Sequence, residues 1–227
     1  MSPGEWIGNN IFSSNRTLIL GESHYEDKNG TKAGEPVDFP TSSVVERYLS
    51  HISGKTPGEH WDRFFTRIAE SFGYSKEVSG EFYDKIFYGN YVPVFCGIGE
   101  NNTAKAFMSA NRTEYNNQLF DFLNEKEIDT VVCFSKDAYW NLPSLAENEK
   151  EFTHDFVLGE IGRGRNIVNY CKYMPDTIHP ACDIKLNKTV QVYGIRHPSC
   201  GGGYNSQQVY KKLSLVEDGL RVLCKHT

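Results

Sequence analysis

Four short runs of apolar, β-forming residues alternate along this chain with stretches that have the periodicity of helices. The runs lie at Thr17–Leu20, Ile86–Phe95, Asp129–Phe134 and Thr189–Ile195. Such alternation is typical of a parallel sheet with helices packed on both of its faces. We therefore expect an α/β fold, with three α/β/α layers built on a central, mostly parallel four-stranded sheet.

Helical periodicity fills most of the intervals between these runs. Helices are expected at residues 41–52, with Thr41 or Ser42 as the cap, and at 57–73, 111–126, 136–142 and 205–222. The region from Ala146 to Asn187 is interpreted as a hairpin or lid, so that residues 146–188 form an insert. Because no linker or shift in composition divides the chain, residues 1–227 are expected to form one domain.

The formal net charge of −5 argues against a protein that binds nucleic acids over its whole surface. Phosphate contacts require clustered Lys and Arg side chains. Small basic clusters are nevertheless present at Gly162–Arg165, at Arg196 and at Lys211–Lys212. A local basic patch beside an active site is therefore compatible with the negative net charge of the protein.

The cysteines are scattered, with no CxxC pair: Cys96, Cys133, Cys171, Cys182, Cys200 and Cys224. This is not the spacing of a zinc or iron–sulfur site, and we expect neither a metal nor another cofactor. The N-terminal residues lack the basic start and apolar run of a signal peptide, and no window approaches a membrane span. We therefore expect a cytoplasmic protein with reduced thiols and no membrane attachment.

Polar side chains gather where three of the apolar runs end. Glu22, Ser23, His24 and Tyr25 follow the first run, Asn90 interrupts the second, and His197 follows the last. Each residue alone has an ordinary structural explanation, such as a surface carboxylate or a turn residue. In open α/β sheets, however, ligands bind outside the carboxyl ends of the strands. Together these residues predict one site at that edge.

Three short motifs in this order resemble the uracil-DNA glycosylase superfamily. They are Gly21–Tyr25 (GESHY), Asn90–Pro93 (NYVP) and His197–Ser199 (HPS), and the layout extends over residues 15–223. The resemblance implies an enzyme that flips a uracil or modified pyrimidine out of DNA and hydrolyses its N-glycosidic bond, leaving an abasic site. It implies DNA as the partner, and we expect a monomer without an obligatory protein partner.

The resemblance also implies roles for individual residues. His197 would donate a hydrogen bond to the departing base, and Asn90 would pair with the edge of the base. Phe39 would stack on the base, and Tyr25 would crowd the C5 position and reject thymine. If Tyr25 instead swings aside, a hypermodified cytosine of phage DNA fits, and the protein would be a defence enzyme.

The chain departs from the superfamily at the position that activates water. Ser23 stands where the most active members have Asp, and His24 stands where they have Pro. Glu22, Asp27 or His24 is left to position the water, and we favour Glu22. An alternative is a catalytically inactive member that binds DNA or a nucleotide. A weaker alternative is a metal-dependent hydrolase that uses these groups together with His197.

The loop after the histidine would contact the DNA backbone. Arg196, Ser199 and the backbone amides of Gly201 and Gly202 are the expected phosphate contacts. Tyr204 would stack on a base or act as a wedge. The helix that follows begins near Asn205 or Ser206, and its amino end would favour a phosphate.

Overall fold

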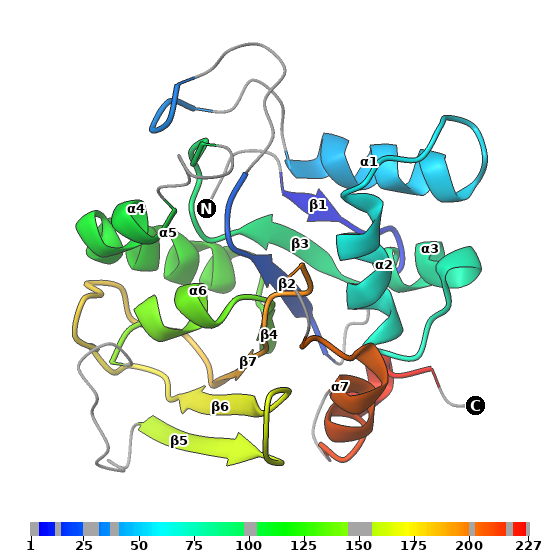
Figure 1. Ribbon diagram of the computed structural model, residues 1–227. Helices are drawn as coiled ribbons and strands as arrows, with labels where there is room; N and C mark the ends of the chain where they lie inside the picture. Colours follow the sequence, from blue (N-terminus) through cyan, green and yellow to red (C-terminus); the bar gives the residue numbers. More distant parts are fainter. Residues whose placement is uncertain are drawn as a thin grey trace.

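The computed structural model describes residues 5–11, 15–24, 32–36, 41–97, 104–144, 156–199, 203–216 and 220–225. Over these residues the strands form one sheet with the order β1-β3-β2-β4-β7-β6-β5 (Figure 1). The strands are β1 (Trp6–Ile7), β2 (Thr17–Gly21), β3 (Phe87–Asn90), β4 (Thr130–Cys133), β5 (Phe156–Ile161), β6 (Val168–Tyr173) and β7 (Val190–Gly194). The expected α/β class is confirmed.

The centre of the sheet consists of β3, β2, β4 and β7, which are parallel to one another. These strands lie within or overlap the four runs expected from the sequence. The expectation of four strands in all is wrong, because seven strands are present among the described residues. β1 pairs antiparallel with β3 at one edge, and the β5–β6 hairpin pairs antiparallel with β7 at the other. A two-residue strand is too short to give a periodic signal, and the hairpin lies inside the segment interpreted as an insert.

Helices cover both faces of this sheet (Figure 1). On one face lie α4 (Ala104–Ala110), α5 (Arg112–Glu125) and α6 (Lys136–Asn141). On the other lie α1 (Thr41–Ile52), α2 (Asp62–Glu70), α3 (Ser79–Tyr83), α7 (Ser206–Leu213) and α8 (Leu220–Leu223), with a 3₁₀ turn, η1, at Lys76–Val78. No helix in the described ranges is long and apolar enough to cross a membrane.

Strand β2 divides the two hydrophobic cores because successive side chains point to opposite faces. Leu18 and Leu20 pack under α4, α5 and α6, whereas Ile19 packs under α1, α2 and α7. All three side chains are fully buried, which contributes about 2 kcal/mol each. The apolar run thus fixes β2 at the centre of the molecule, and the residue after it is carried to the edge of the sheet.

Two of the expected helices differ from the observed ones by more than one residue. The helix expected at 57–73 begins at Asp62, because the Asp62 carboxylate accepts a hydrogen bond from the Glu59 amide (3.0 Å) and holds that segment as a turn. The closing helix expected at 205–222 is divided into α7 and α8. Asn205 caps α7 by accepting from the Gln208 amide (2.9 Å), as expected.

Candidate functional site

The carboxyl ends of the four parallel strands lie at one edge of the sheet. The backbone register pairs Gly21 at the end of β2 with Asn90 at the end of β3, and Cys133 at the end of β4 with Gly194 at the end of β7. The residues that follow these ends are therefore neighbours although they are far apart in sequence. This edge is the predicted location of the site.

Glu22 is anchored directly after β2. Its carboxylate accepts a hydrogen bond from the hydroxyl of Ser135, the residue that caps α6 after β4. The same Ser135 oxygen accepts the Ala138 amide (3.1 Å). Glu22 is thereby held at the carboxyl edge with one oxygen engaged. Sequence reasoning found Ser135 only as a helix cap, because its contact with Glu22 joins residues 113 positions apart.

His197 has a defined tautomer when its ring is neutral. Its Nδ1 accepts a hydrogen bond from the Ser199 amide (3.2 Å), so the proton lies on Nε2. The ring stacks on Phe64 of α2, with ring centroids 5.0 Å apart and planes inclined by 28°. Burial lowers the pKa of His197, and the nearby Glu22 carboxylate opposes that shift. At neutral pH the residue is an uncharged hydrogen-bond donor near a carboxylate.

His24 and Asn90 form a separate, buried network. The Asn90 amide nitrogen donates to His24 Nε2 (3.3 Å), which also contacts the Thr41 hydroxyl (3.3 Å). Tyr88 donates to the Asn90 amide oxygen (3.5 Å). Burial lowers the pKa of His24 to about 4, so this ring is neutral at pH 7 with Nε2 occupied. These contacts do not favour His24 as the base that activates water.

Gly21 is required for this network to fit. A Cβ atom at position 21 would lie 2.3 Å from the Asn90 side-chain oxygen and 2.7 Å from the Tyr88 hydroxyl. Both polar atoms of the Asn90 side chain have partners inside the protein. Its predicted pairing with a base stays a prediction, and the base would have to share these atoms with their partners inside the protein.

Ser23 is buried beside the same network. Burial raises the pKa of the Cys96 thiol to about 11, and the Ser23 hydroxyl opposes that shift. The Ser23 side chain therefore faces a thiol in the interior. This position gives Ser23 no water-activating contact within the described residues, and Glu22 remains the better candidate for that role.

The residues that flank His197 were predicted to contact DNA. Arg196 lies against Gly203, where a Cβ atom would be 3.0 Å from the Arg196 guanidinium carbon. Ser199 is exposed, and its amide positions the His197 ring. The Tyr204 hydroxyl hydrogen bonds with Ser71, and this ring packs against α2. Tyr204 therefore does not project as a wedge in this structure.

Several predicted site residues lie outside the described ranges. They are Tyr25, Asp27, Phe39, Gly201 and Gly202. Their predicted roles in base and phosphate binding stay predictions. In the described ranges, no group of three or more His, Cys, Asp and Glu side chains is placed to hold a metal ion.

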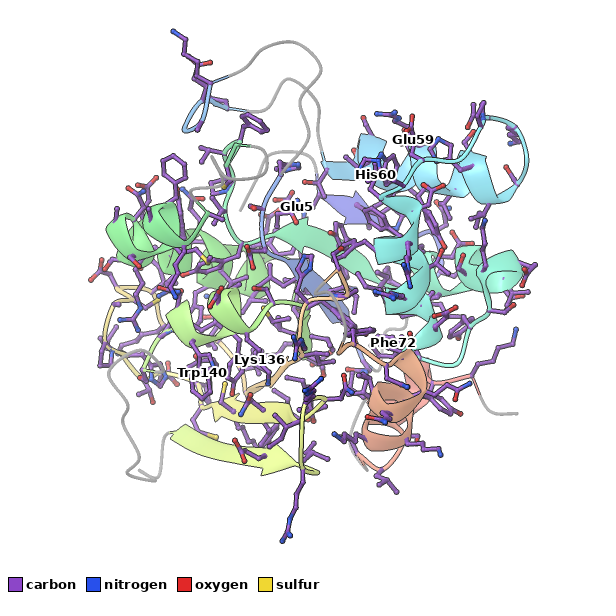
Figure 2. The ribbon with its side chains drawn as sticks, in the orientation of Figure 1. Glu5, Glu59, His60, Phe72, Lys136 and Trp140 are labelled. Carbon is purple, nitrogen blue, oxygen red and sulfur yellow. The ribbon has the colours of Figure 1, made fainter. Side chains whose placement is uncertain are left out.

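Lys136 is a notable residue at this edge that sequence reasoning missed. It lies at the start of α6 (Figure 2). Its ammonium donates to the Gly194 carbonyl (2.8 Å) and to the Asn169 side-chain oxygen. Asn169 in turn donates to Glu160 (3.1 Å). Burial lowers the pKa of Lys136 to about 8. The only signal in the sequence was the position of this lysine directly after Ser135, the cap of α6. Its buried partner on β6, Asn169, could not be predicted from the sequence. The contacts bind α6 to β6 and β7.

Comparison of the sequence with protein-family models gives no match, and comparison with curated proteins gives none either. The geometry of the carboxyl edge therefore provides the basis for a functional interpretation. Glu22 and His197 are two partly accessible polar residues at this edge, and the Glu22 carboxylate influences the pKa of His197.

Proposed function

We propose that this protein is a monofunctional DNA glycosylase that removes a uracil or a modified pyrimidine. One observation supports the proposal above the others. His197 is held as a neutral ring with its proton on Nε2, and Glu22 is close enough to influence its pKa. A hydrogen-bond donor for the departing base and a carboxylate for the attacking water are the two groups that this hydrolysis requires.

The proposed reaction is a simple hydrolysis. The bond between the sugar C1′ and the base nitrogen breaks, and its electron pair passes to the pyrimidine ring. His197 Nε2–H stabilises the negative charge that gathers on the carbonyl oxygen of the base. Glu22 accepts a hydrogen bond from the water that attacks C1′, and then its proton. The products are the free base, which takes up a proton, and an abasic sugar with a hydroxyl group on C1′.

Burial is important for this role of His197. A protonated ring would require desolvation of a charge, whereas the neutral donor is stable beside Phe64. Its Nδ1 accepts a hydrogen bond from the Ser199 amide, so Nε2–H is the donor that the neutral ring would offer to the base. The short HPS segment thus both ends β7 and orients the ring.

A second candidate function is a catalytically inactive protein that binds DNA or a nucleotide. The observation that favours it is that both polar atoms of the Asn90 side chain already have a partner inside the protein, His24 and Tyr88. The burial of Ser23 points the same way. This candidate predicts binding without product.

Base removal from defined duplexes separates the two candidates. Duplexes would carry one uracil, one 5-hydroxymethylcytosine or one glucosylated cytosine, and alkali would convert abasic sites to strand breaks. Cleavage of any of the three supports the glycosylase. Retained binding with no break on any of them, while a reference glycosylase is active in the same buffer, would overturn it. Single strands of the same sequences show whether the enzyme requires a duplex.

A further inference from the structure

A cavity of about 610 Å³ lies between α2 and the start of α7, next to the His197 segment. Its lining residues are Arg63, Arg67, Arg165, Asn166, Gly203, Tyr204, Asn205 and Gln208. Three of them are arginines and none is acidic. In a protein whose formal net charge is −5, this concentration of positive charge requires an explanation.

The walls of this arginine cavity are held by hydrogen bonds. The Arg67 guanidinium donates to the Pro198 carbonyl and lies over the Tyr204 ring, 6.0 Å from its centroid. Buried Asn166 accepts the Asn205 amide (3.2 Å) and donates to the Gln208 side chain (2.8 Å). These contacts join α2, the β5–β6 turn and α7. A cavity assembled in this way is organised before a ligand arrives.

Arg63 and Arg165 are the exposed arginines of the cavity. In the part of the chain that the structure describes, no ion pair involves Arg63. Asn205 and Gln208 border the cavity from the first turn of α7, whose amino end carries a partial positive charge. Planar guanidinium groups beside a helix amino terminus match the geometry and charge of a phosphate.

We propose that the arginine cavity binds a phosphate group of the substrate. The cavity adjoins the candidate site through two contacts of α2 with the His197 segment. Arg67 holds the carbonyl of Pro198, the residue after His197, and Phe64 lies between Arg63 and Arg67 on α2 and stacks on His197. A phosphate in the cavity therefore belongs to the nucleotide at His197 or to its neighbour. The identity of the ligand as part of a DNA strand rests on the proposed function.

Phosphate recognition is tested by a binding measurement that needs no catalysis. Anisotropy of a fluorescent 12-nucleotide single strand would be titrated with wild type, Arg63→Gln, and Arg63→Gln/Arg165→Gln. Arg163→Gln is the matched control, because this arginine is exposed in the same turn as Arg165 but does not line the cavity. Thermal melts check that each variant folds. Inorganic phosphate and deoxyuridine monophosphate serve as competitors.

Each cavity arginine should contribute about tenfold to the affinity, and its loss should lower the salt dependence of log K by about 0.7. Arg163→Gln should bind like wild type. Competition by the monophosphate at micromolar concentrations indicates a free nucleotide as ligand, whereas competition only by DNA indicates a strand; both support phosphate recognition. Equal affinities of wild type, Arg63→Gln and the double variant would overturn it.

The outcome for the cavity is independent of the outcome for the glycosylase. If the arginine variants lose affinity but no duplex yields abasic sites, the phosphate site stands and the proposed function falls. If abasic sites form and the double variant binds and cleaves like wild type, the proposed function stands and the phosphate site falls.

Discussion

The two halves of the carboxyl edge use similar residues for opposite purposes. After β2 and β3, His24 and Asn90 form a network in which His24 Nε2 and both polar atoms of the Asn90 side chain meet a partner in the interior. In the other half, His197 follows β7, and Glu22 reaches across from the end of β2 to Ser135 after β4. Both residues are only partly buried, and the arginine cavity lies beside the His197 segment. Both halves contain a histidine whose pKa is lowered by burial.

The difference teaches that a lowered pKa does not identify a functional histidine. His24 is neutral because its ring is sealed among Asn90 and Thr41, and its Nε2 is an acceptor already in use. His197 is neutral with Nε2–H as a donor, and this residue is partly accessible. The role of Nε2, which accepts a hydrogen bond in His24 and carries the proton in His197, therefore distinguishes the structural ring from the candidate catalytic one.

The largest effect should follow removal of the accessible ring. His197→Ala deletes the proposed donor to the base, and the single-turnover rate of base removal should fall ~10²-fold or more. The melting temperature of His197→Ala should differ little from that of the control His60→Ala. His60 is an exposed histidine outside the proposed site. An unchanged rate on a substrate that wild type cleaves would remove His197 from the chemistry.

The buried ring of His24 should instead determine how stability depends on pH. The pKa of His24 is lowered by burial from 6.5 to about 4, whereas the unfolded chain keeps the ordinary value. Between these values the unfolded state binds a proton that the folded state does not. The contribution is therefore complete above pH 6.5 and is lost as pH falls towards 4, by roughly 3 kcal/mol in total.

Urea unfolding at several pH values between 7 and 4 measures this contribution. His24→Gln is the control, because glutamine keeps an acceptor for Asn90 and does not titrate. Burial lowers the pKa of His197 in both proteins, so the difference between the two curves isolates His24. Parallel curves would show that His24 is not buried as a neutral ring.

The Asn90 amide should matter more for stability than an equally bonded amide at the surface. Asn90→Ala leaves His24 Nε2 and the Tyr88 hydroxyl without this partner, at a cost of about 2 kcal/mol. Asn117, which bonds with Asp183 in an exposed setting, provides the matched Asn117→Ala control, with a loss below about 1 kcal/mol. Equal losses by urea unfolding would contradict the division between the two halves. Retained base removal in Asn90→Ala would in addition show that Asn90 does not hold the base.

The sequence predicted the central strands because they are uniformly apolar. Leu18, Ile19 and Leu20 can only be buried, and a parallel sheet then places Glu22, Asn90 and His197 at one edge. It did not predict which of the polar residues would turn inward. That outcome depends on contacts such as His24 with Asn90, which are 66 positions apart and leave no local pattern.

The arginine cavity was also beyond sequence reasoning, for a related reason. Its arginines come from α2 and from the β5–β6 turn, and α7 completes the wall. The sequence showed the basic cluster at Gly162–Arg165 but gave no sign that Arg63 and Arg67 lie beside it. Arg196 was correctly noticed as a charge near the histidine, and its contact with Gly203 places it next to this wall.

The smallest expected effect concerns the link between Glu22 and Ser135. Ser135→Ala removes the cap of α6, which should cost about 1 kcal/mol of stability. It also removes the hydroxyl that donates to Glu22. A double-mutant cycle with Glu22→Gln separates the two effects, because the cap is lost in both arms in which Ser135 is changed. Since hydrogen bonds to a charged group are stronger than neutral ones, the coupling energy should be about 1.5 kcal/mol. Additive losses in urea unfolding would show that Glu22 is not held by Ser135, and the carboxylate would then lack its fixed position opposite His197.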